Sequence, residues 1–316
     1  MKQLLFLFLT ITLNSYSQDF SKVDSIVKAY PKFSKVEDLA NKISTDFTSD
    51  SDKIRASFYW IATNIRYNLK EYYKPTQRRY SFYYSSEEDK KQKLQTLIDN
   101  LVIKTFISKK GVCEEYAQSL KKIYDLLQIE STVIKGYVRN NANEIGKIRH
   151  NTNHAWNAVK LNNEWIILDA TWAAGYELNR KWVKEFDNYY YNIPKEKIFK
   201  THFPEETIWV LRFGRMTKEE FYNQPIYNNT FLSSGIELKN PTNGIINIRN
   251  KANLEFEFIG LNESLYYLLT GEKYLKKAEI IKKGEKSIVS IANPKRKTTL
   301  IFFIKNRNAV QFNLVY

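Results

Sequence analysis

The chain contains one cysteine, Cys113, together with the other residue types that cysteine acyl transfer requires. A thiolate can attack a carbonyl carbon when an imidazole takes the thiol proton and an acid group holds that imidazole in the correct tautomer. His154 and Asp169 follow the cysteine in the sequence and are the candidates for these two roles. The three residues therefore predict a catalytic triad of Cys113, His154 and Asp169.

Cys113 lies where the sequence predicts the start of a helix over residues 111–130. Free backbone N–H groups and the positive end of the helix dipole favour a thiolate at such a position. An inert cysteine remains an alternative, because a small apolar residue at this place could be buried with the apolar stripe of the helix. That stripe consists of Ala117, Leu120 and Tyr124.

His154 and Asp169 lie on two predicted strands, 154–161 and 165–172, which Asn162-Asn163 joins by a tight turn. In a hairpin with a two-residue turn, both side chains point to the same side of the sheet as diagonal neighbours, about 7–8 Å apart. A register slip of one residue would place them on opposite faces. The other face is expected to pack as core, with Val159, Leu161, Ile166 and Leu168.

The remaining histidines predict no metal site. His150 and His154 stand four residues apart, as on a zinc-binding helix, but the residues between them lead into a strand and the glutamate of an HExxH motif is missing. For His202 we prefer a structural role over a supporting role beside the triad. We therefore expect neither a metal nor a cofactor.

Periodicity divides the rest of the chain into a helical beginning and a β-rich end. Residues 19–69 repeat apolar positions at helical steps, and residues 132–138 predict a strand. From Pro225 onward, short β-rich runs alternate with turn signals and predict a β-sandwich of about 90 residues. The expected domains are a catalytic domain over 18–224 and a sandwich over 225–316.

Residues 1–17 have the pattern of a secretory signal peptide, with Lys2, an apolar run over 4–13, and small residues before a cleavage point near Ser17. The apolar run is shorter than the roughly 20 residues that span a bilayer. A buried helix or a membrane anchor is the weaker alternative. We expect an exported protein, periplasmic or secreted, without stable membrane insertion after cleavage.

Charge and aromatic content bear on the partner. Lys plus Arg number 49 against 34 Asp plus Glu, but the lysines are scattered from Lys22 to Lys305, which is typical of a solvated surface rather than of a nucleic-acid footprint. We expect no nucleic-acid partner. The aromatic stretch over 67–84 predicts either one wall of a substrate groove or half-buried loop residues.

Three ordered blocks of the sequence resemble the core of the transglutaminase-like superfamily: residues 111–117 (GVCEEYA), 154–159 (HAWNAV) and 165–172 (WIILDATW). The resemblance covers about residues 20–225. Within the superfamily the sequence is most similar to the kyphoscoliosis-peptidase-like branch and is identified as a bacterial, exported member. The further segments that carry this similarity are 58–67, 186–191 and 201–204.

The resemblance implies an α+β fold with a papain-like cysteine-enzyme core, N-terminal helices and an antiparallel sheet, followed by the Ig-like β-sandwich. It also implies that the Cys113 thiolate attacks carboxamide carbonyls of proteins or peptides, and that water or an amine resolves the thioester. The Cys113 backbone N–H would be one oxyanion donor. The second donor stays open, with Trp60 only a guess. The calcium sites of animal transglutaminases have no visible counterpart here.

The leading hypothesis is thus an exported cysteine peptidase, amidase or acyltransferase, with hydrolysis and transfer left undecided. A rival of another class is a non-catalytic, transglutaminase-like protein-binding module in which the triad is an unused remnant. Cleavage of cell-wall peptides is a third possibility, because the exported protein is basic.

Overall fold

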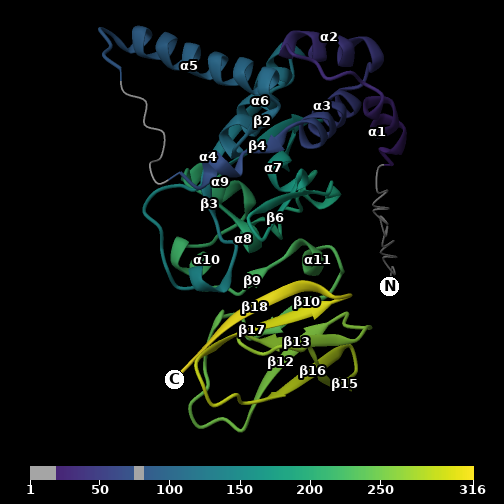
Figure 1. Cartoon of the computed structure of the whole chain (residues 1–316), viewed down its shortest axis with the longest axis vertical. Helices are drawn as coiled ribbons and strands as arrows, with labels where there is room; N and C mark the ends of the chain where they lie inside the picture. The colour runs from purple at the N-terminus through teal and green to yellow at the C-terminus, as the bar shows by residue number, and fades with distance from the viewer. Residues whose placement is uncertain (1–18, 75–81) are drawn as a thin grey trace, which may run out of the picture.

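The computed structural model describes residues 19–74 and 82–316, so the predicted signal peptide over 1–17 lies outside the described residues. In the view of Figure 1, helices occupy the upper end of the molecule, a small sheet lies in the middle, and a β-sandwich forms the lower end. Within the described ranges, no helix is both long enough and apolar enough to cross a membrane.

The predicted N-terminal helices are α1 (Ser21–Lys28), α2 (Val36–Asp46) and α3 (Asp50–Asn64). The side chain of Ser49 accepts a hydrogen bond from the Asp52 amide and so caps α3, as such residues do at helix starts. Apolar residues at helical spacing form the buried face of these helices. They include Leu39, Ile43, Ile54, Phe58 and Ile61.

Helix α5 (Glu87–Ser108) has no counterpart among the elements predicted from the sequence. Its early turns are charged, and it buries only Val102, Thr105 and Phe106 near its end, so it lacks a long apolar stripe. Figure 1 shows the N-terminal end of α5 projecting away from the other helices. Before it stand β1 (Arg66–Tyr67) and α4 (Leu69–Tyr72).

The helix that carries the cysteine is α6 (Cys113–Leu126), which confirms the predicted helix start. It packs against α2, α3 and α5 on one side and against strands β3 and β4 on the other. Strand β2 (Lys110–Gly111) runs directly into it and pairs in parallel with β1, so that Gly111 is opposite Tyr67. Tyr67, which is distant in the sequence, is thereby held beside the residues that lead into α6.

The central sheet has the strand order β5-β4-β3-β8 and is antiparallel. Its strands are β3 (Ser131–Val138), β4 (His154–Leu161), β5 (Glu164–Leu168) and β8 (His202–Pro204). Leu161 is opposite Glu164, which confirms the predicted hairpin register. One detail is wrong: the second strand ends at Leu168 instead of Trp172, because the next residues form helix α7 (Ala170–Ala173).

Both faces of β4 are buried, from His154 through Val159, so the face that carries His154 is enclosed as well as the face that packs as core. Further elements lead from this sheet toward the sandwich. They are η1 (Ala142–Glu144), β6 (Gly175–Leu178), β7 (Lys181–Lys184), η2 (Asn188–Tyr190), α8 (Ile198–Thr201), α9 (Thr207–Phe213) and α10 (Lys218–Asn223).

Gly136 on β3 is the point where the strands carrying the two buried histidines meet. It is paired with His154 on β4 and with Pro204 on β8. A Cβ atom at this position would lie 2.3 Å from the Phe203 carbonyl oxygen and 2.5 Å from Cη2 of Trp156. Only glycine therefore lets β8 approach β3 this closely.

We expect Gly136→Ala to lower the free energy of unfolding by about 1–3 kcal/mol, the usual cost of forcing an extra methyl group into a packed interior. Because β8 and Trp156 would have to move apart, the buried histidines should shift as well. Denaturant titration followed by tryptophan fluorescence measures the loss. An unchanged denaturation midpoint would contradict this prediction, because it would mean that β3 and β8 accommodate the extra methyl group without cost.

The C-terminal part is the predicted β-sandwich, made of two facing sheets with orders β10-β12-β16-β15 and β11-β18-β17-β13-β14. Its aromatic core is separate from that of the helical part and includes Phe256, Phe258, Phe302 and Phe312. The strands are β9 (Ile226–Tyr227), β10 (Glu237–Asn240), β11 (Ile245–Asn247), β12 (Asn253–Ile259), β13 (Leu265–Leu269), β14 (Lys276–Lys277), β15 (Glu279–Lys283), β16 (Lys286–Ala292), β17 (Thr298–Ile304) and β18 (Arg307–Val315), with α11 (Asn229–Leu232) after β9.

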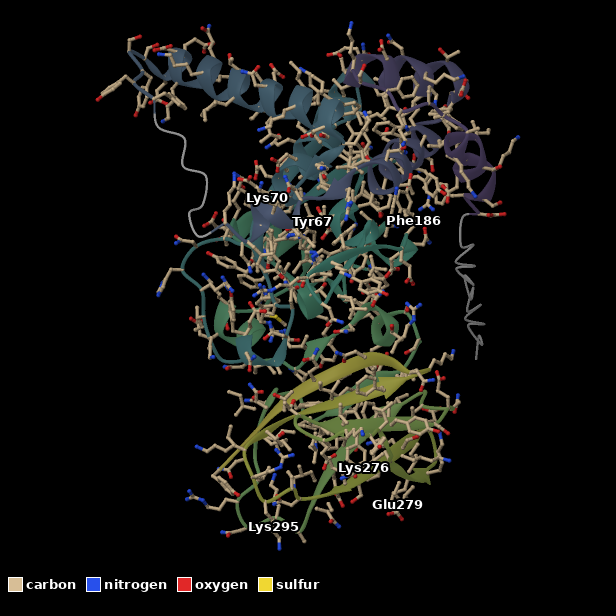
Figure 2. All side chains as sticks on the ribbon, viewed as in Figure 1. Tyr67, Lys70, Phe186, Lys276, Glu279 and Lys295 are labelled. Atoms are coloured by element: carbon tan, nitrogen blue, oxygen red, sulfur yellow. The ribbon has the colours of Figure 1, made fainter. Side chains whose placement is uncertain are left out.

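Strand β9 pairs with β18, so the sandwich begins close to the predicted start at residue 225, although the exact domain boundaries stay a prediction. The two parts are joined by hydrogen bonds: the amide of Ala142 donates to Oε1 of Gln311, and Nδ2 of Asn313 donates to the carbonyl of Ala142. In Figure 2, Lys276 and Lys295 lie on the sandwich, whereas Tyr67 lies in the upper part.

Candidate active site

Cys113 is the first residue of α6, and it is partly exposed. The carboxylate of Glu115 accepts a hydrogen bond from the Val112 amide at 3.1 Å and stabilises this helix start. Backbone amides in a first helical turn have no carbonyl partner within the helix. Cys113 therefore lies at the positive end of the helix dipole, and it is not fully buried as the alternative interpretation expects.

His154 and Asp169 are in direct contact: Nε2 of His154 lies 2.7 Å from Oδ2 of Asp169, and both side chains are buried. Burial lowers the pKa of His154, but Asp169 and then Cys113 raise it, so the thiol belongs to the surroundings of the imidazole. The structure thus brings together His154 and Asp169 of the predicted triad, and the role of Cys113 stays a prediction.

His154 and Asp169 each favour the charged form of the other. Burial by itself lowers the pKa of His154, but the charge and hydrogen bond of Asp169 together with the contact to Cys113 outweigh burial and raise it to about 10. Burial alone would raise the pKa of Asp169, yet the two histidines beside it hold that pKa well below its usual range. At neutral pH the site therefore contains an imidazolium and a carboxylate.

Asp169 is also the cap of helix α7. Its Oδ1 accepts hydrogen bonds from the amides of Thr171 at 2.9 Å and Trp172 at 3.0 Å. An aspartate at this place ends β5 and starts the helix at once, because its carboxylate satisfies amides that the helix leaves unpaired. The oxygen Oδ1 is thereby held in place, and Oδ2 is directed toward the imidazole.

His202 is the residue whose place the sequence interpretation missed. Its Nε2 lies 3.0 Å from Oδ2 of Asp169, and its Nδ1 lies 2.7 Å from Oγ1 of Thr201. The ring is fully buried between the indoles of Trp156 and Trp172, at centroid distances of 4.9 and 4.7 Å. His202 thus contacts the site carboxylate directly, which a merely structural role does not describe.

His154, Asp169 and His202 are also close enough in space to suggest a metal site, since their ligand atoms lie within 4.8 Å of one another. Two ligands on one tetrahedral zinc ion stand about 3.3–3.5 Å apart, given bonds of about 2.0–2.1 Å. The 2.7 Å contact between His154 and Asp169 is shorter and has the length of a charge-assisted hydrogen bond. His150 is exposed in a loop, not on a helix. The cluster fits an acid–base network better than a metal centre.

Two tyrosines of the predicted aromatic stretch, Tyr67 and Tyr72, interact electrostatically with Cys113. Tyr67 stacks on Trp182 of β7 at a centroid distance of 5.1 Å and packs against Tyr72 at 5.7 Å. Burial, and next the charge of Cys113, raises the pKa of Tyr67, and Cys113 also contributes to the raised pKa of Tyr72. These two tyrosines are therefore neighbours of the thiol. Tyr83 points into solvent, and Tyr80 lies outside the described residues.

Trp60, the guess for a second oxyanion donor, is placed elsewhere. It is fully buried, stacks on Phe106 at 5.4 Å and packs against Phe33 at 6.1 Å. A side chain enclosed in the helical core cannot point to a substrate carbonyl. The guess is therefore wrong, and the Cys113 amide remains the predicted donor.

A thiol at a helix start, an imidazole on a strand and a carboxylate directly after the neighbouring strand are the parts of a cysteine acyl-transfer site, and the comparisons with known proteins agree with this class. Residues 37–170 match the model of the Transglutaminase-like superfamily. These residues therefore form a transglutaminase-like domain, and the chain is similar to the kyphoscoliosis peptidases. The human kyphoscoliosis peptidase is 22% identical over 244 residues, 76% of this chain and 34% of the human protein.

Two further similarities are weaker. Cytokinesis protein 3 of Schizosaccharomyces pombe is 28% identical over 152 residues, 47% of this chain and 17% of that protein. A crystal structure of a TGase is 14% identical, with a TM-score of 0.31 over 58% of this chain and 40% of that one, which is too low to support a conclusion. The chain spans about a third of the length of the curated kyphoscoliosis peptidases that it matches.

Proposed function

We propose that this protein is a cysteine-dependent enzyme that transfers the acyl group of protein or peptide amides through a thioester on Cys113. The observation that carries the proposal is the buried pair of His154 and Asp169, 2.7 Å apart, whose imidazole has a pKa that burial lowers but that Asp169 and then Cys113 raise. Partial exposure of the cysteine gives a substrate access to the sulfur.

In the first half of the reaction, the Cys113 thiolate attacks the amide carbonyl carbon, and the carbonyl electrons move to oxygen. The Cys113 amide stabilises this oxyanion. His154 then gives its Nδ1 proton to the leaving nitrogen, the C–N bond breaks, and a thioester and a free amine result. Asp169 holds the imidazole throughout by its bond to Nε2.

In the second half, water or an amine attacks the thioester carbonyl carbon, and His154 takes a proton from this attacking nucleophile. The C–S bond breaks, and the thiolate and imidazolium are restored. Hydrolysis and transfer differ only in which nucleophile enters, so the same residues serve both. We propose proteins and peptides as the substrate class, with cell-wall peptides as one candidate, and export from the cell on the pattern of residues 1–17.

The test is the pH dependence of alkylation by iodoacetamide. A thiolate held beside an imidazolium should react with iodoacetamide well below pH 7, whereas an unperturbed thiol, with a pKa of about 8.5, reacts slowly there. Rates at pH 5, 6 and 8 are measured by mass spectrometry of the Cys113 peptide. The unfolded protein in denaturant is the matched control, because it has the same thiol without the imidazole. Equal pH profiles for folded and unfolded protein would favour the non-catalytic binding module.

A further inference from the structure

We propose that His202 is a positioning residue of this site: it donates a hydrogen bond from Nε2 to Oδ2 of Asp169 and thereby controls how strongly that carboxylate holds the proton on His154. The inference rests on the proposed function only for its consequence in catalysis. The contact itself is a distance of 3.0 Å between two buried atoms.

The direction of this hydrogen bond follows from the partners. An ionised carboxylate can only accept, so the nitrogen facing Asp169 must carry a proton. Burial lowers the pKa of His202 despite the carboxylate beside it, so its ring is neutral and has one N–H, at Nε2. Nδ1 then accepts a hydrogen bond from the hydroxyl of Thr201, at 2.7 Å. The carboxylate of Asp169 therefore fixes the tautomer of His202, and the Thr201 hydroxyl, which also lies 3.4 Å from the Ile198 carbonyl oxygen, supports it at Nδ1.

With His202 included, the carboxylate of Asp169 has four donors. Oδ1 accepts from two amides of α7, and Oδ2 is shared by the two imidazoles. An oxygen that accepts two hydrogen bonds is a weaker base toward each donor than one that accepts a single bond. His202 therefore moderates the attraction of Asp169 for the proton of His154, and it leaves the imidazolium able to give up a proton during the reaction.

Other titratable groups near this carboxylate are few. The hydroxyls of Tyr67, Tyr116 and Tyr190 interact with the charge of Asp169, and Cys113 interacts with His154. The pKa of each tyrosine is raised, first of all by burial, so these hydroxyls stay neutral in the range where histidines titrate. His154 and His202 are therefore the groups whose protonation responds to Asp169.

The experiment compares His202→Phe, which fills the space without a donor, with His202→Gln, whose amide can donate in place of Nε2. His154 is titrated by NMR in the Cys113→Ala protein, so that the result does not depend on catalysis. We expect the Phe variant to raise the pH at which His154 loses its proton by roughly one unit, and the Gln variant to remain near the parent. His150→Gln, a change at an exposed loop histidine, is the matched control and should change nothing.

If the Phe variant does not fold, His202→Met, with its adaptable side chain, replaces it. A folded apolar variant with an unchanged titration of His154 would overturn the inference. A loss of reactivity below pH 7 in the unmodified protein would instead overturn the proposed function and leave the titration result intact.

Discussion

Replacing Cys113 by Ala is expected to reduce amide turnover by at least about 10⁴-fold, the scale on which loss of the nucleophile acts in enzymes of this type. Cys113 is the only cysteine of the sequence, so no other thiol can form the thioester in the variant. An electrophilic amide probe should label the parent protein at Cys113 and leave the variant unlabelled. Mass spectrometry of the labelled peptide gives the position.

The same variant should keep its fold. Cys113 is partly exposed at a helix start, and exchanges of small side chains at such places usually alter stability little. The free energy of unfolding of the variant should therefore lie within about 1 kcal/mol of that of the parent. Circular dichroism during denaturation checks this. A variant that is folded and still turns over amides at the parental rate would refute the assignment of the nucleophile.

Asp169→Asn is expected to be the most damaging single change to the site. The amide has nearly the same volume, but it replaces a buried charge that accepts four hydrogen bonds and stands beside an imidazolium. Removing one partner of a buried ion pair costs about 3–5 kcal/mol of stability. Turnover should also fall by about 10⁴-fold, because an asparagine favours the wrong tautomer of the histidine.

The stability loss in Asp169→Asn should depend on pH in a defined way. His154 has a pKa of about 10 in the folded protein against an ordinary 6.5, so its contribution is complete below pH 6.5 and disappears as the pH rises through 10. The pKa of Asp169 is lowered from an ordinary 3.8, so its contribution is complete above that value and is lost as the pH falls further. The difference between parent and variant should be largest between pH 4 and 6.5.

Denaturant unfolding at pH 4, 6, 8 and 10 measures this difference. Asp125→Asn is the matched control, because that aspartate lies at the surface in an i,i+4 ion pair with Lys121 and should contribute little. A difference that is the same at pH 6 and at pH 10 would mean that His154 is not charged by its contact with Asp169.

Local sequence was sufficient where the interactions are local. The turn at Asn162-Asn163 sets the register of β4 and β5, and the register sets which side chains share a face. The apolar period of α6 likewise places Cys113 at a helix start. Both were predictable because turn chemistry and helical periodicity act over a few residues.

The errors occurred where side-chain capping or burial decided the structure. The strand expected to reach Trp172 stops at Leu168, since the carboxylate of Asp169 starts a new helix. Helix α5 escaped prediction because its early turns are charged and its buried residues gather near its end. Trp60 was misplaced because helical periodicity does not tell which part of the core a buried face meets.

By itself, the sequence determined the residue types of the triad, the helix start, the hairpin and the succession of a mixed part and a β-sandwich. Only the tertiary structure decided what surrounds them: His202 reaches Asp169 from a strand 33 residues away, and the pairing of β1 with β2 places Tyr67 opposite Gly111, just before the start of α6. Such neighbours depend on how distant segments pack. Apolar periodicity shows which face of an element is buried, but because apolar burial is non-directional it does not show which distant element that face meets.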